Sequence, residues 1–471
     1  MDNAASITCW CVIPRAANDA ILVRNAAGRY QCTTVPLRLQ RTEFFPDHIP
    51  AIRKEILAST GIDGTVLRHL VNQDTVQICL IEIQGAPDTL PDGYHWLEPS
   101  QVADVAWADE ESQMAWRAWS DAIAVDTATL QPWERAGWFG EARQWIESRL
   151  DEAHYRPIGQ IEQVKGAWGW SSILQVETDR GPVYFKADYA RPPKEVEVIL
   201  KLAERWPGCV PDFIAVDIDR NWMLMPDFGG TRMDGLDPAS YGDAVSRFAQ
   251  IQRSTAAHID SWRSLGCPDM TPESLSVLAR QLVADKTALC EVKGGLTLDE
   301  WEQLYRSMPA IEAILNRLAA STVPSVVSSE DFRAGNVMQR ADGYVFFDWG
   351  NTVITHPFFG INYFLNRMSR PEDANGFLWR NELEDDLRQG LAATFLGEWR
   401  DYAPWEQLVD EFWLCRRIYH LYEAVKCYTD LPYIGTTAPW GANARDFIPQ
   451  AARTLLTSLD YQPANLRLSM P

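Results

Sequence analysis

Residues 326–338 read Val326-Val-Ser-Ser-Glu-Asp331-Phe-Arg-Ala-Gly-Asn336-Val-Met338, and this stretch decides the fold. A short apolar run leads into Asp331, and Asn336 follows five positions later. With this spacing the chain can turn back, so that Asp331 faces an acceptor group while the amide oxygen of Asn336 faces a metal ion. Asp and Asn are also frequent in ordinary turns. On its own, therefore, the stretch leaves a plain turn as the alternative.

A second stretch supplies another candidate metal ligand. It reads Tyr344-Val-Phe-Phe-Asp348-Trp-Gly350, an apolar strand that ends in a carboxylate. The pair Asp342-Gly343, which lies between the two stretches, is typical of a hairpin turn. We therefore expect Asn336 and Asp348 to lie side by side on a hairpin and to bind one magnesium ion.

Phosphoryl transfer needs a loop over the phosphates, a Lys that holds them, oxygen ligands for Mg²⁺ and a carboxylate that orients the acceptor hydroxyl. Lys186 lies in Gly181-Pro-Val-Tyr-Phe-Lys186-Ala187, which alternates like a strand. Glu195 lies in a predicted helix, where it could pair with Lys186 and hold it towards the phosphates. Glu197 is a weaker candidate, because Lys201 follows it four positions later. For these charged residues, a solvated surface position is the alternative.

Two further segments could contact the nucleotide. Residues 166–172, which read GAWGWSS, form a predicted turn whose backbone N–H groups, with the hydroxyls of Ser171 and Ser172, could close over phosphates. The turn matches neither of the two common glycine-rich phosphate motifs. Residues 222–230 form an apolar strand broken by proline and glycine. In a two-lobed kinase, this hinge would hydrogen-bond the adenine, and Met225 would line the pocket.

The chain divides into four segments by pattern. We expect an α+β domain over residues 1–124, a linker helix within 125–152, a small lobe over 153–229 and a mostly helical lobe over 230–471. This order indicates an α+β protein with a bilobal protein-kinase-like fold. The predicted strands are 7–13, 20–24, 35–39, 76–83, 164–165, 173–177, 182–187, 213–216 and 222–226. The predicted helices are 49–59, 110–124, 133–150 and 194–206.

From about residue 133 to residue 364 the chain resembles the aminoglycoside phosphotransferase family of kinases. The similar stretches include VYFKA, VPDFIAVD, WMLMPDFGG, SSEDFRAGNV and FFDWGNTVITHPFF. The resemblance implies that Asp331 is the catalytic base and that Asn336 and Asp348 bind Mg²⁺. It also implies that the cofactor is ATP or GTP.

The chain departs from this family directly before the catalytic Asp, where Ser329-Glu330 replaces the usual His-Gly. That His helps to hold the loop, so the loop geometry and the rate are what the change would affect. The segment 410–428 is rich in acids and rings. In the similar family such helices line the acceptor pocket and bind cationic amines; a solvated face with an apolar core stripe is the alternative. For His356 we expect a packing role.

The first domain resembles a Nudix hydrolase. Ile52-Arg-Lys-Glu55-Ile-Leu-Ala58-Ser59-Thr-Gly61-Ile62 matches the second half of the Nudix box in outline. Diphosphate hydrolysis uses divalent metal held by several carboxylates, but Ala58 and Ser59 replace a paired Glu here, and only Glu55 remains. We therefore expect a catalytically inactive Nudix-like α/β domain, which binds a ligand or shapes the acceptor site; a folding or packing module is the alternative.

Composition limits the partners. The 471 residues carry a formal net charge of −21, which argues against nucleic acid and against an anionic membrane surface. No apolar stretch reaches the roughly 18 residues of a membrane span, and we expect no signal peptide. Among nine cysteines, only Cys9 and Cys11 are a close pair, which favours buried thiols in a reducing, cytoplasmic setting. Nothing in the sequence indicates the oligomeric state.

The sequence thus predicts a Mg²⁺-dependent phosphotransferase that uses ATP or GTP and acts on a hydroxyl of a small molecule. The acceptor would be an aminoglycoside or another metabolite. One alternative is a non-catalytic nucleotide sensor, in which a pseudokinase is joined to a pseudo-Nudix domain. Another is a Nudix hydrolase with an accessory lobe, against which the missing carboxylates argue.

Overall fold

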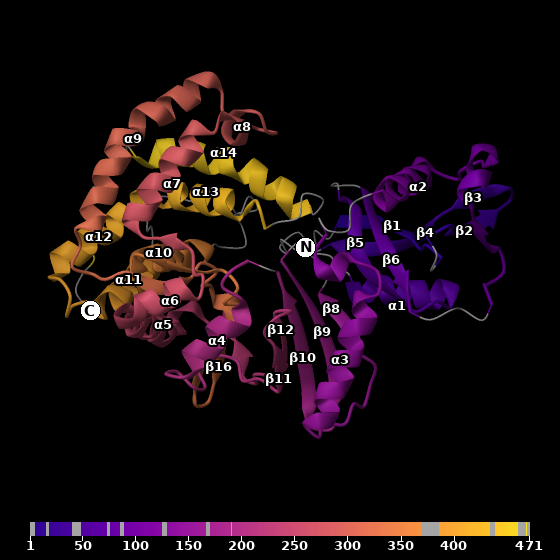
Figure 1. Ribbon diagram of the computed structural model, residues 1–471, viewed down its shortest axis with the longest axis horizontal. Coiled ribbons are helices and arrows are strands. Elements are labelled where there is room, and N and C mark those ends of the chain that lie inside the picture. The colour runs from indigo at the N-terminus through magenta and orange to yellow at the C-terminus, as the bar shows by residue number, and fades with distance from the viewer. Residues whose placement is uncertain are drawn as a thin grey trace.

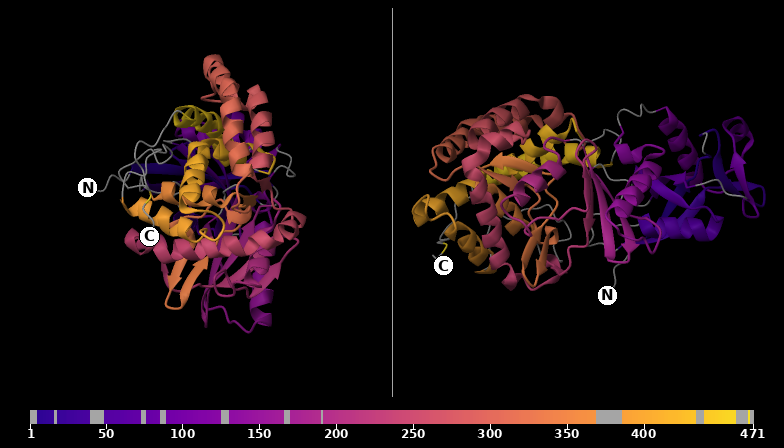
Figure 2. Two further views of the ribbon diagram at one scale, coloured as in Figure 1. Left: turned by 90° about the vertical axis from the view of Figure 1, so that its left-hand side faces the viewer. Right: turned by 60° about the horizontal axis from the view of Figure 1, so that its bottom comes forward.

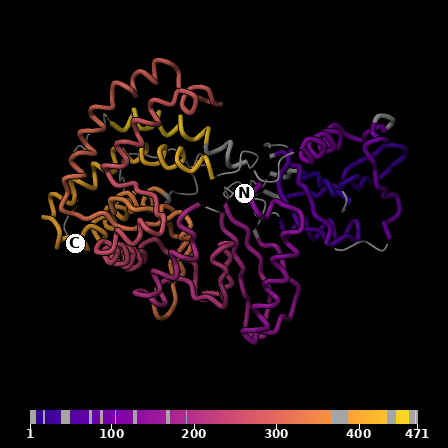
Figure 3. The backbone as a smooth tube through the Cα atoms, in the orientation of Figure 1, coloured from indigo at the N-terminus to yellow at the C-terminus, as the bar shows by residue number. Residues whose placement is uncertain are grey.

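The computed structural model describes residues 5–15, 18–39, 49–72, 76–84, 89–124, 130–165, 170–189, 191–368, 386–433, 439–459 and 468. Figure 1 shows an N-terminal domain at the right, a lobe built on a sheet in the middle and a helical lobe at the left. The tube in Figure 3 follows the chain through the same three parts. We call the last two the sheet lobe, residues 138–226, and the helical lobe, residues 231–459.

In its described residues, the N-terminal domain combines two small sheets with two α-helices. Its elements are β1 (Ala5–Val12), β2 (Ile21–Ala26), β3 (Arg29–Gln31), β4 (Thr33–Leu39), α1 (Ile49–Thr60), β5 (Gly64–Asn72), β6 (Val76–Ile83), β7 (Tyr94–Leu97) and α2 (Glu110–Ile123). The sheets have the orders β4-β1-β6-β5 and β3-β2-β7. Cys9 and Cys11, two positions apart on β1, face the same way and pack with Ile52 and Ile56 of α1. Trp119 of α2 packs in the core on the other face.

The sheet lobe places Lys186 by strand alternation. Its elements are α3 (Trp138–Glu152), β8 (Glu162–Lys165), β9 (Ser171–Thr178), β10 (Gly181–Asp188), α4 (Glu195–Ala203), β11 (Ala215–Asp217) and β12 (Trp222–Pro226), and the sheet has the order β11-β12-β10-β9-β8. Phe185 and Leu224 pack on one face against α3, which runs along the sheet in Figure 1 and Figure 2. Met223, which pairs with Lys186, belongs to the core on the other face, together with Ile199 of α4. Lys186 is therefore directed towards α4.

Where the structure describes it, the helical lobe surrounds two three-stranded sheets, ordered β13-β16-β17 and β14-β18-β15. Its helices are α5 (Gly242–Thr255), α6 (Ile259–Ser264), α7 (Pro272–Ala284), α8 (Lys286–Cys290), α9 (Leu298–Ala319), α10 (Pro357–Arg367), α11 (Asp386–Gly397), α12 (Trp405–Arg417), α13 (Tyr419–Asp430) and α14 (Pro439–Leu459). Its strands are β13 (Thr231–Arg232), β14 (Asp269–Met270), β15 (Val326–Ser329), β16 (Val337–Arg340), β17 (Gly343–Phe346) and β18 (Thr352–Thr355). Phe332 stacks between Phe248 and Phe364, with ring centroids 3.6 and 4.6 Å away, so the residue after Asp331 is anchored in the core.

The hairpin predicted from Asp342-Gly343 is confirmed. Strands β16 and β17 pair from Val337 with Phe346 to Arg340 with Gly343. Gly230 passes the hairpin so closely that an added Cβ would lie 2.1 Å from the carbonyl oxygen of Gln339. Glycine at this position lets the chain leave β12 and cross the hairpin that carries the candidate site.

The N-terminal domain contacts the first strand of the sheet lobe. The side-chain amide of Gln163 in β8 accepts a hydrogen bond from Val66 N at 3.0 Å and donates one to Val66 O at 2.8 Å. Arg53 of α1 donates to the carbonyl oxygen of Ile161 at 3.1 Å. Because Gln163 is almost fully buried, these bonds lie in a water-poor junction between the two domains.

The predicted elements are mostly confirmed, with differences that include the start of α3, strand β5 and the start of β9. The helix expected over 133–150 begins at Trp138, because Gly137 with a φ of +87° precedes it. Strand β5 was not predicted; its register shifts in two places, and such shifts break the alternation of a regular strand. Ser171 and Ser172, expected in a turn, are the first two residues of β9.

Candidate active site

Lys186 joins the two lobes at the centre of the site. Its Nζ lies 2.6 Å from Oε2 of Glu195 in α4 and 2.7 Å from Oδ1 of Asp348 in the helical lobe. Burial by itself lowers the pKa of Lys186, but the carboxylates of Asp348 and Glu195 outweigh it and raise that pKa well above its usual range. Lys186 is therefore a fixed cation between two lobes.

Glu195 also fixes the backbone beside Asp348. While one of its oxygens contacts Lys186, the other accepts a hydrogen bond from Trp349 N at 2.9 Å. Asp348 itself has a φ of +65°, in the left-handed region that Asp tolerates better than most residues. This conformation turns the chain sharply at the end of the strand and exposes about 32% of the Asp348 side chain. The carboxylate is thus accessible to a ligand while it contacts Lys186.

Asp331 is held at both carboxylate oxygens. Tyr363 of α10 donates its hydroxyl hydrogen to Oδ1 at 2.5 Å, and Asn336 donates from Nδ2 to Oδ2 at 2.8 Å. Ser329 Oγ accepts from Asp331 N at 3.3 Å and donates to the carbonyl oxygen of Asp348 at 3.3 Å. Ser329 therefore links the Asp331 loop to the Asp348 turn at the position where the similar family has His.

Asn336 and Asp348 fit the needs of a magnesium ion. The Asn336 amide nitrogen is used by Asp331, so its Oδ1 remains as a ligand atom, and within the described ranges this oxygen accepts no hydrogen bond. Phe347 N donates to the carbonyl oxygen of Asn336 at 3.1 Å and ties the two ligand segments together. Among the described residues no group of three or more His, Cys, Asp or Glu could hold a metal ion. Two oxygen ligands from the protein are what Mg²⁺ needs when phosphate and water oxygens complete its shell.

Asp188 is a site residue that the sequence interpretation missed. It lies two positions after Lys186 on the same face of β10. Burial raises its pKa well above the usual range, Lys186 opposes this shift, and Glu195 and Asp348 add to it. An added Cβ at Gly350 would lie 2.3 Å from Asp188 Oδ2, so a larger residue there would displace the Asp188 carboxylate. The alternation of Lys186 with Asp188 was the signal that could have revealed it.

Behind Asp331 lies a buried charge cluster of Arg191, Glu330, Lys426 and Asp430. Oε2 of Glu330 lies 3.8 Å from Arg191 Nη2 and 3.8 Å from Lys426 Nζ, and Arg191 Nε lies 2.8 Å from Asp430 Oδ1. Burial raises the pKa of Asp430 to about 6, although Arg191 opposes the shift. Glu330, which stands in place of the family's Gly, thus connects the Asp331 loop with α13 and with the segment that leads into α4.

The structure brings Asp331, Lys186, Glu195, Asn336 and Asp348 into one connected set, and it leaves the other predicted residues at its border. Ser171 and Ser172 are buried at the start of β9, and Met225 is buried in β12. Residues 166–169 of the predicted phosphate turn lie outside the described residues. The contacts of Ser171, Ser172 and Met225 with a nucleotide stay predictions.

The acidic segment of α12 and α13 is largely engaged within the protein. Glu411 accepts from Ser321 Oγ at 2.7 Å and lies 3.6 Å from His356 Nε2, and Glu423 accepts from Tyr419 at 2.8 Å. Asp410 pairs with Arg317. These contacts favour the packing interpretation over an amine-binding pocket. His356 caps α10 by accepting from Phe358 N, which confirms its packing role.

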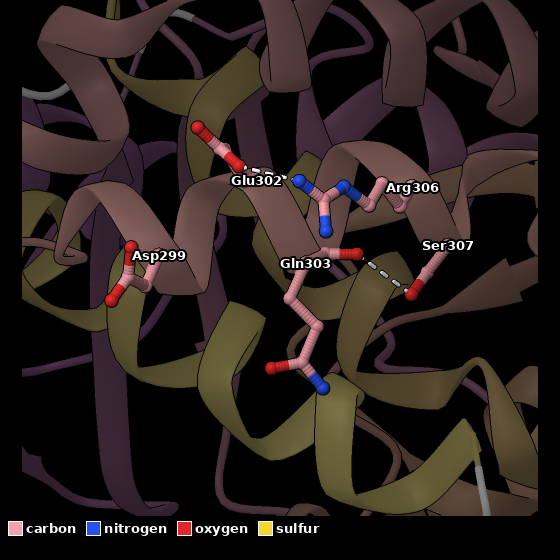
Figure 4. A pocket seen from close by; sticks show the side chains of 5 residues that line it. All are labelled: Asp299, Glu302, Gln303, Arg306 and Ser307. Atoms are coloured by element: carbon pink, nitrogen blue, oxygen red, sulfur yellow. Dashed lines mark hydrogen bonds and ion pairs between the residues drawn. The ribbon is translucent and has the colours of Figure 1, made fainter.

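A shallow polar hollow lies on α9 and includes none of the candidate site residues. Figure 4 shows its lining, which comes from Asp299, Glu302, Gln303, Arg306 and Ser307. Arg306 pairs with Glu302 at 2.7 Å, one turn earlier on the same helix. Such an i,i+4 pair on one exposed helix face is ordinary surface structure.

A model of the phosphotransferase enzyme family matches residues 164–405. No curated protein sequence matches the chain. Among solved structures, an ethanolamine kinase of Plasmodium vivax is similar at 11% identity and a TM-score of 0.43, with 62% of this chain and 82% of that chain covered. A macrolide 2′-phosphotransferase of Brachybacterium faecium is similar at 15% identity and a TM-score of 0.42, with 69% and 100% covered. A choline kinase of Cryptosporidium parvum is similar at 11% identity and a TM-score of 0.41, with 64% and 88% covered. Within the residues described above, no helix is both long and apolar enough to cross a membrane.

Proposed function

The chain belongs to the phosphotransferase enzyme family, and on that basis we propose that it transfers the γ-phosphate of ATP or GTP to a hydroxyl of a small molecule. The observation that carries this proposal is the position of Lys186. It contacts the carboxylate of the α4 helix and the carboxylate of the Asp348 turn, at 2.6 and 2.7 Å, and so places a buried cation between the sheet lobe and the helical lobe. A Lys held by a helix Glu is the arrangement that kinases use for nucleotide phosphates.

Each group of the site has a distinct role in this proposal. Asp331 accepts the proton of the acceptor hydroxyl and orients its oxygen for attack on phosphorus. Lys186, once nucleotide is bound, holds the phosphates and balances the charge of the leaving diphosphate. Asn336 and Asp348 hold Mg²⁺, which when bound neutralises phosphate charge. The strategy is positioning and charge balance, with no covalent intermediate on the protein.

The nucleotide would lie between the lobes. We propose that Ser171 and Ser172 contact the phosphates and that the chain at Met225 contacts the base. The nine free cysteines fit the reducing interior of a cell, where ATP and GTP are supplied, so we place the protein in the cytoplasm.

For the N-terminal domain we propose a Nudix-like domain without hydrolase activity. Glu55, the carboxylate that remains of the box, is exposed on α1. In the part of the chain that the structure describes, it belongs to no cluster of metal ligands. The domain would either act as a packing module at its junction with β8 or bind a ligand.

The proposal is tested with the full chain, Mg²⁺, either nucleotide and a panel of amino alcohols, sugars, aminoglycosides and macrolides. The measurement is ADP or GDP release, together with mass spectrometry for phosphorylated products. Asp331→Asn should lower turnover by about 10²–10⁴-fold, as expected for loss of a general base, and leave nucleotide affinity nearly unchanged. The matched control is Asp342→Asn, an exposed carboxylate in the turn of the nearby β16–β17 hairpin.

Three outcomes separate the hypotheses. Turnover in the unchanged protein that disappears in Asp331→Asn supports the phosphotransferase. Turnover that survives in Asp331→Asn contradicts the role of this residue as the base. Tight nucleotide binding with no turnover on any acceptor favours the nucleotide sensor, for which Glu330 in place of Gly is the structural argument.

A further inference from the structure

Arg333 is a positive charge beside the proposed catalytic base. It follows Asp331 by two positions, and its Nε donates to Asp331 Oδ2 at 3.3 Å. About 44% of its side chain is exposed. Among the described residues, the guanidinium makes no other hydrogen bond, so the N–H donors of both Nη groups are available to a ligand. A guanidinium with two free N–H₂ groups is suited to phosphate oxygens.

The guanidinium of Arg333 lies close to the backbone at Gly335. An added Cβ on Gly335 would lie 3.0 Å from Arg333 Nη1 and 3.2 Å from Asp234 Oδ2. Glycine at this position therefore lets the guanidinium lie close to the loop that carries Asn336. Burial lowers the pKa of Arg333, but Asp331, Tyr363 and Asp348 outweigh it and raise the pKa. The positive charge of Arg333 therefore interacts with the proposed base, Asp331, and with the proposed metal ligand, Asp348.

These two carboxylates mark the ends of the proposed reaction. The acceptor oxygen lies at Asp331, and the metal-bound nucleotide phosphates lie at Asp348. The transferring phosphoryl group must pass between them, and negative charge is spread over its three equatorial oxygens in the transition state. A cation at this point stabilises the transition state more than the bound nucleotide.

We propose that Arg333 is a further catalytic residue whose Nη groups hydrogen-bond the transferring phosphoryl group. The inference rests on the proposed phosphotransferase function. In the step, a bond forms between the acceptor oxygen and the γ-phosphorus, and the bond from the γ-phosphorus to the bridging oxygen breaks. The nucleoside diphosphate leaves with that electron pair, and the acceptor proton goes to Asp331. Arg333 stays protonated throughout.

A purely structural role for Arg333 would be to orient Asp331 through Nε. Two substitutions separate the roles. Arg333→Gln can still donate to Asp331 but has no charge, and Arg333→Lys keeps a charge but lacks the fork. The matched control is Arg232→Gln, which removes another exposed arginine that pairs, at 2.6 Å, with an aspartate two positions away.

The readout is binding of ADP with Mg²⁺, measured with and without aluminium fluoride, which mimics the transferring phosphoryl group. In the unchanged chain, aluminium fluoride should tighten ADP binding. Arg333→Gln should lose most of that gain, keep its affinity for ADP with Mg²⁺ within about twofold, and lower turnover by about 10²–10³-fold, the usual cost of one transition-state donor. Arg333→Lys should lie between, and Arg232→Gln should match the unchanged chain.

If Arg333→Gln keeps the full gain from aluminium fluoride, the residue only positions Asp331 and the inference is wrong. That result leaves the proposed function intact. If aluminium fluoride does not increase the affinity of the unchanged chain for ADP, and the unchanged chain shows no turnover, the proposed function fails. The inference then fails with it.

Discussion

Lys186 Nζ and Asp348 Oδ1 lie 2.7 Å apart, so the cation of the sheet lobe contacts a proposed metal ligand of the helical lobe. Lys186 also neutralises Glu195, whose side chain is about 2% exposed. Removing the cation would leave this carboxylate buried without its partner, and such a loss costs about 3–5 kcal/mol. We expect Lys186→Met to lose stability of that order, and Lys186→Met with Glu195→Gln to recover much of it. Urea unfolding measures both, with Lys194→Met as the control. Equal stability of the single and double variants would contradict the pairing.

Metal dependence should distinguish the two proposed ligands from their neighbours. Asn336→Ala and Asp348→Asn each remove an oxygen ligand, so we expect the Mg²⁺ concentration for half-maximal turnover to rise by at least about tenfold. The exposed Asp342, on the same hairpin, is the control. The measurement is a Mg²⁺ titration of turnover at saturating nucleotide. An unchanged Mg²⁺ requirement in both variants would remove these residues from the metal site.

The buried charge cluster should show strong coupling between Glu330 and Lys426. Glu330→Gln removes a carboxylate that lies 3.8 Å from both Arg191 and Lys426, and leaves the two cations with less compensation. We expect a loss of about 3–5 kcal/mol of stability. Lys426→Met combined with Glu330→Gln should cost less than the sum of the two single changes. A double-mutant cycle measures this difference, and additivity within about 0.5 kcal/mol would show that the pair is not coupled.

Stability should fall in acid because of His420 in α13. Burial, with Arg416, lowers its pKa to about 3 from the usual 6.5. The folded state therefore keeps His420 neutral, while the unfolded chain takes up a proton below pH 6.5. The stabilisation is present above that pH and is lost as the pH falls towards 3. Between pH 7 and pH 4 we expect His420→Phe to lose less stability than the unchanged protein, by about 2–3 kcal/mol.

The check is chemical denaturation at both pH values, with His95→Gln, a change at an exposed histidine, as the control. A parallel acid dependence in the His420 variant and the unchanged protein would contradict the assignment.

The N-terminal domain should not hydrolyse nucleoside diphosphates. With Asp331→Asn in the full chain to suppress the proposed transfer, Mg²⁺-dependent release of phosphate from such substrates should stay at background. Glu55→Gln should change nothing further, because one exposed carboxylate cannot hold the metal ions of the reaction. Metal-dependent hydrolysis that disappears in Glu55→Gln would show an active hydrolase instead.

Much of the site could be predicted from local sequence. Asn336 and Asp348 flank one short hairpin, where the turn residues fix the register, and Asp331 lies five positions before Asn336. The face of Lys186 follows from strand alternation. Asp188 follows from the same alternation, whereas Tyr363 could not be identified in this way, because its role depends on a tertiary contact between α10 and the Asp331 loop. Tyr363 reaches Asp331 from α10, 32 positions away in sequence.

The fold was predictable where periodicity is regular and not where it is broken. Strand β6 matches its predicted bounds, 76–83, while its neighbour β5 carries two register shifts that hide its alternation. The buried charge cluster also could not be predicted from the sequence. Nothing near Glu330 in sequence indicates Arg191 or Lys426, and a charged residue in a loop ordinarily predicts exposure.

The two hydrogen bonds between Gln163 and Val66 have a consequence for thermal unfolding. The side chain of Gln163 in β8 pairs there as a neighbouring strand would, with both the N–H and the C=O of one residue, Val66, in another domain. Separating the domains would break both of these buried hydrogen bonds before either core had been disturbed, which opposes independent unfolding of the two domains. Heating should therefore produce a single calorimetric peak for the N-terminal domain and the sheet lobe, rather than two separated ones.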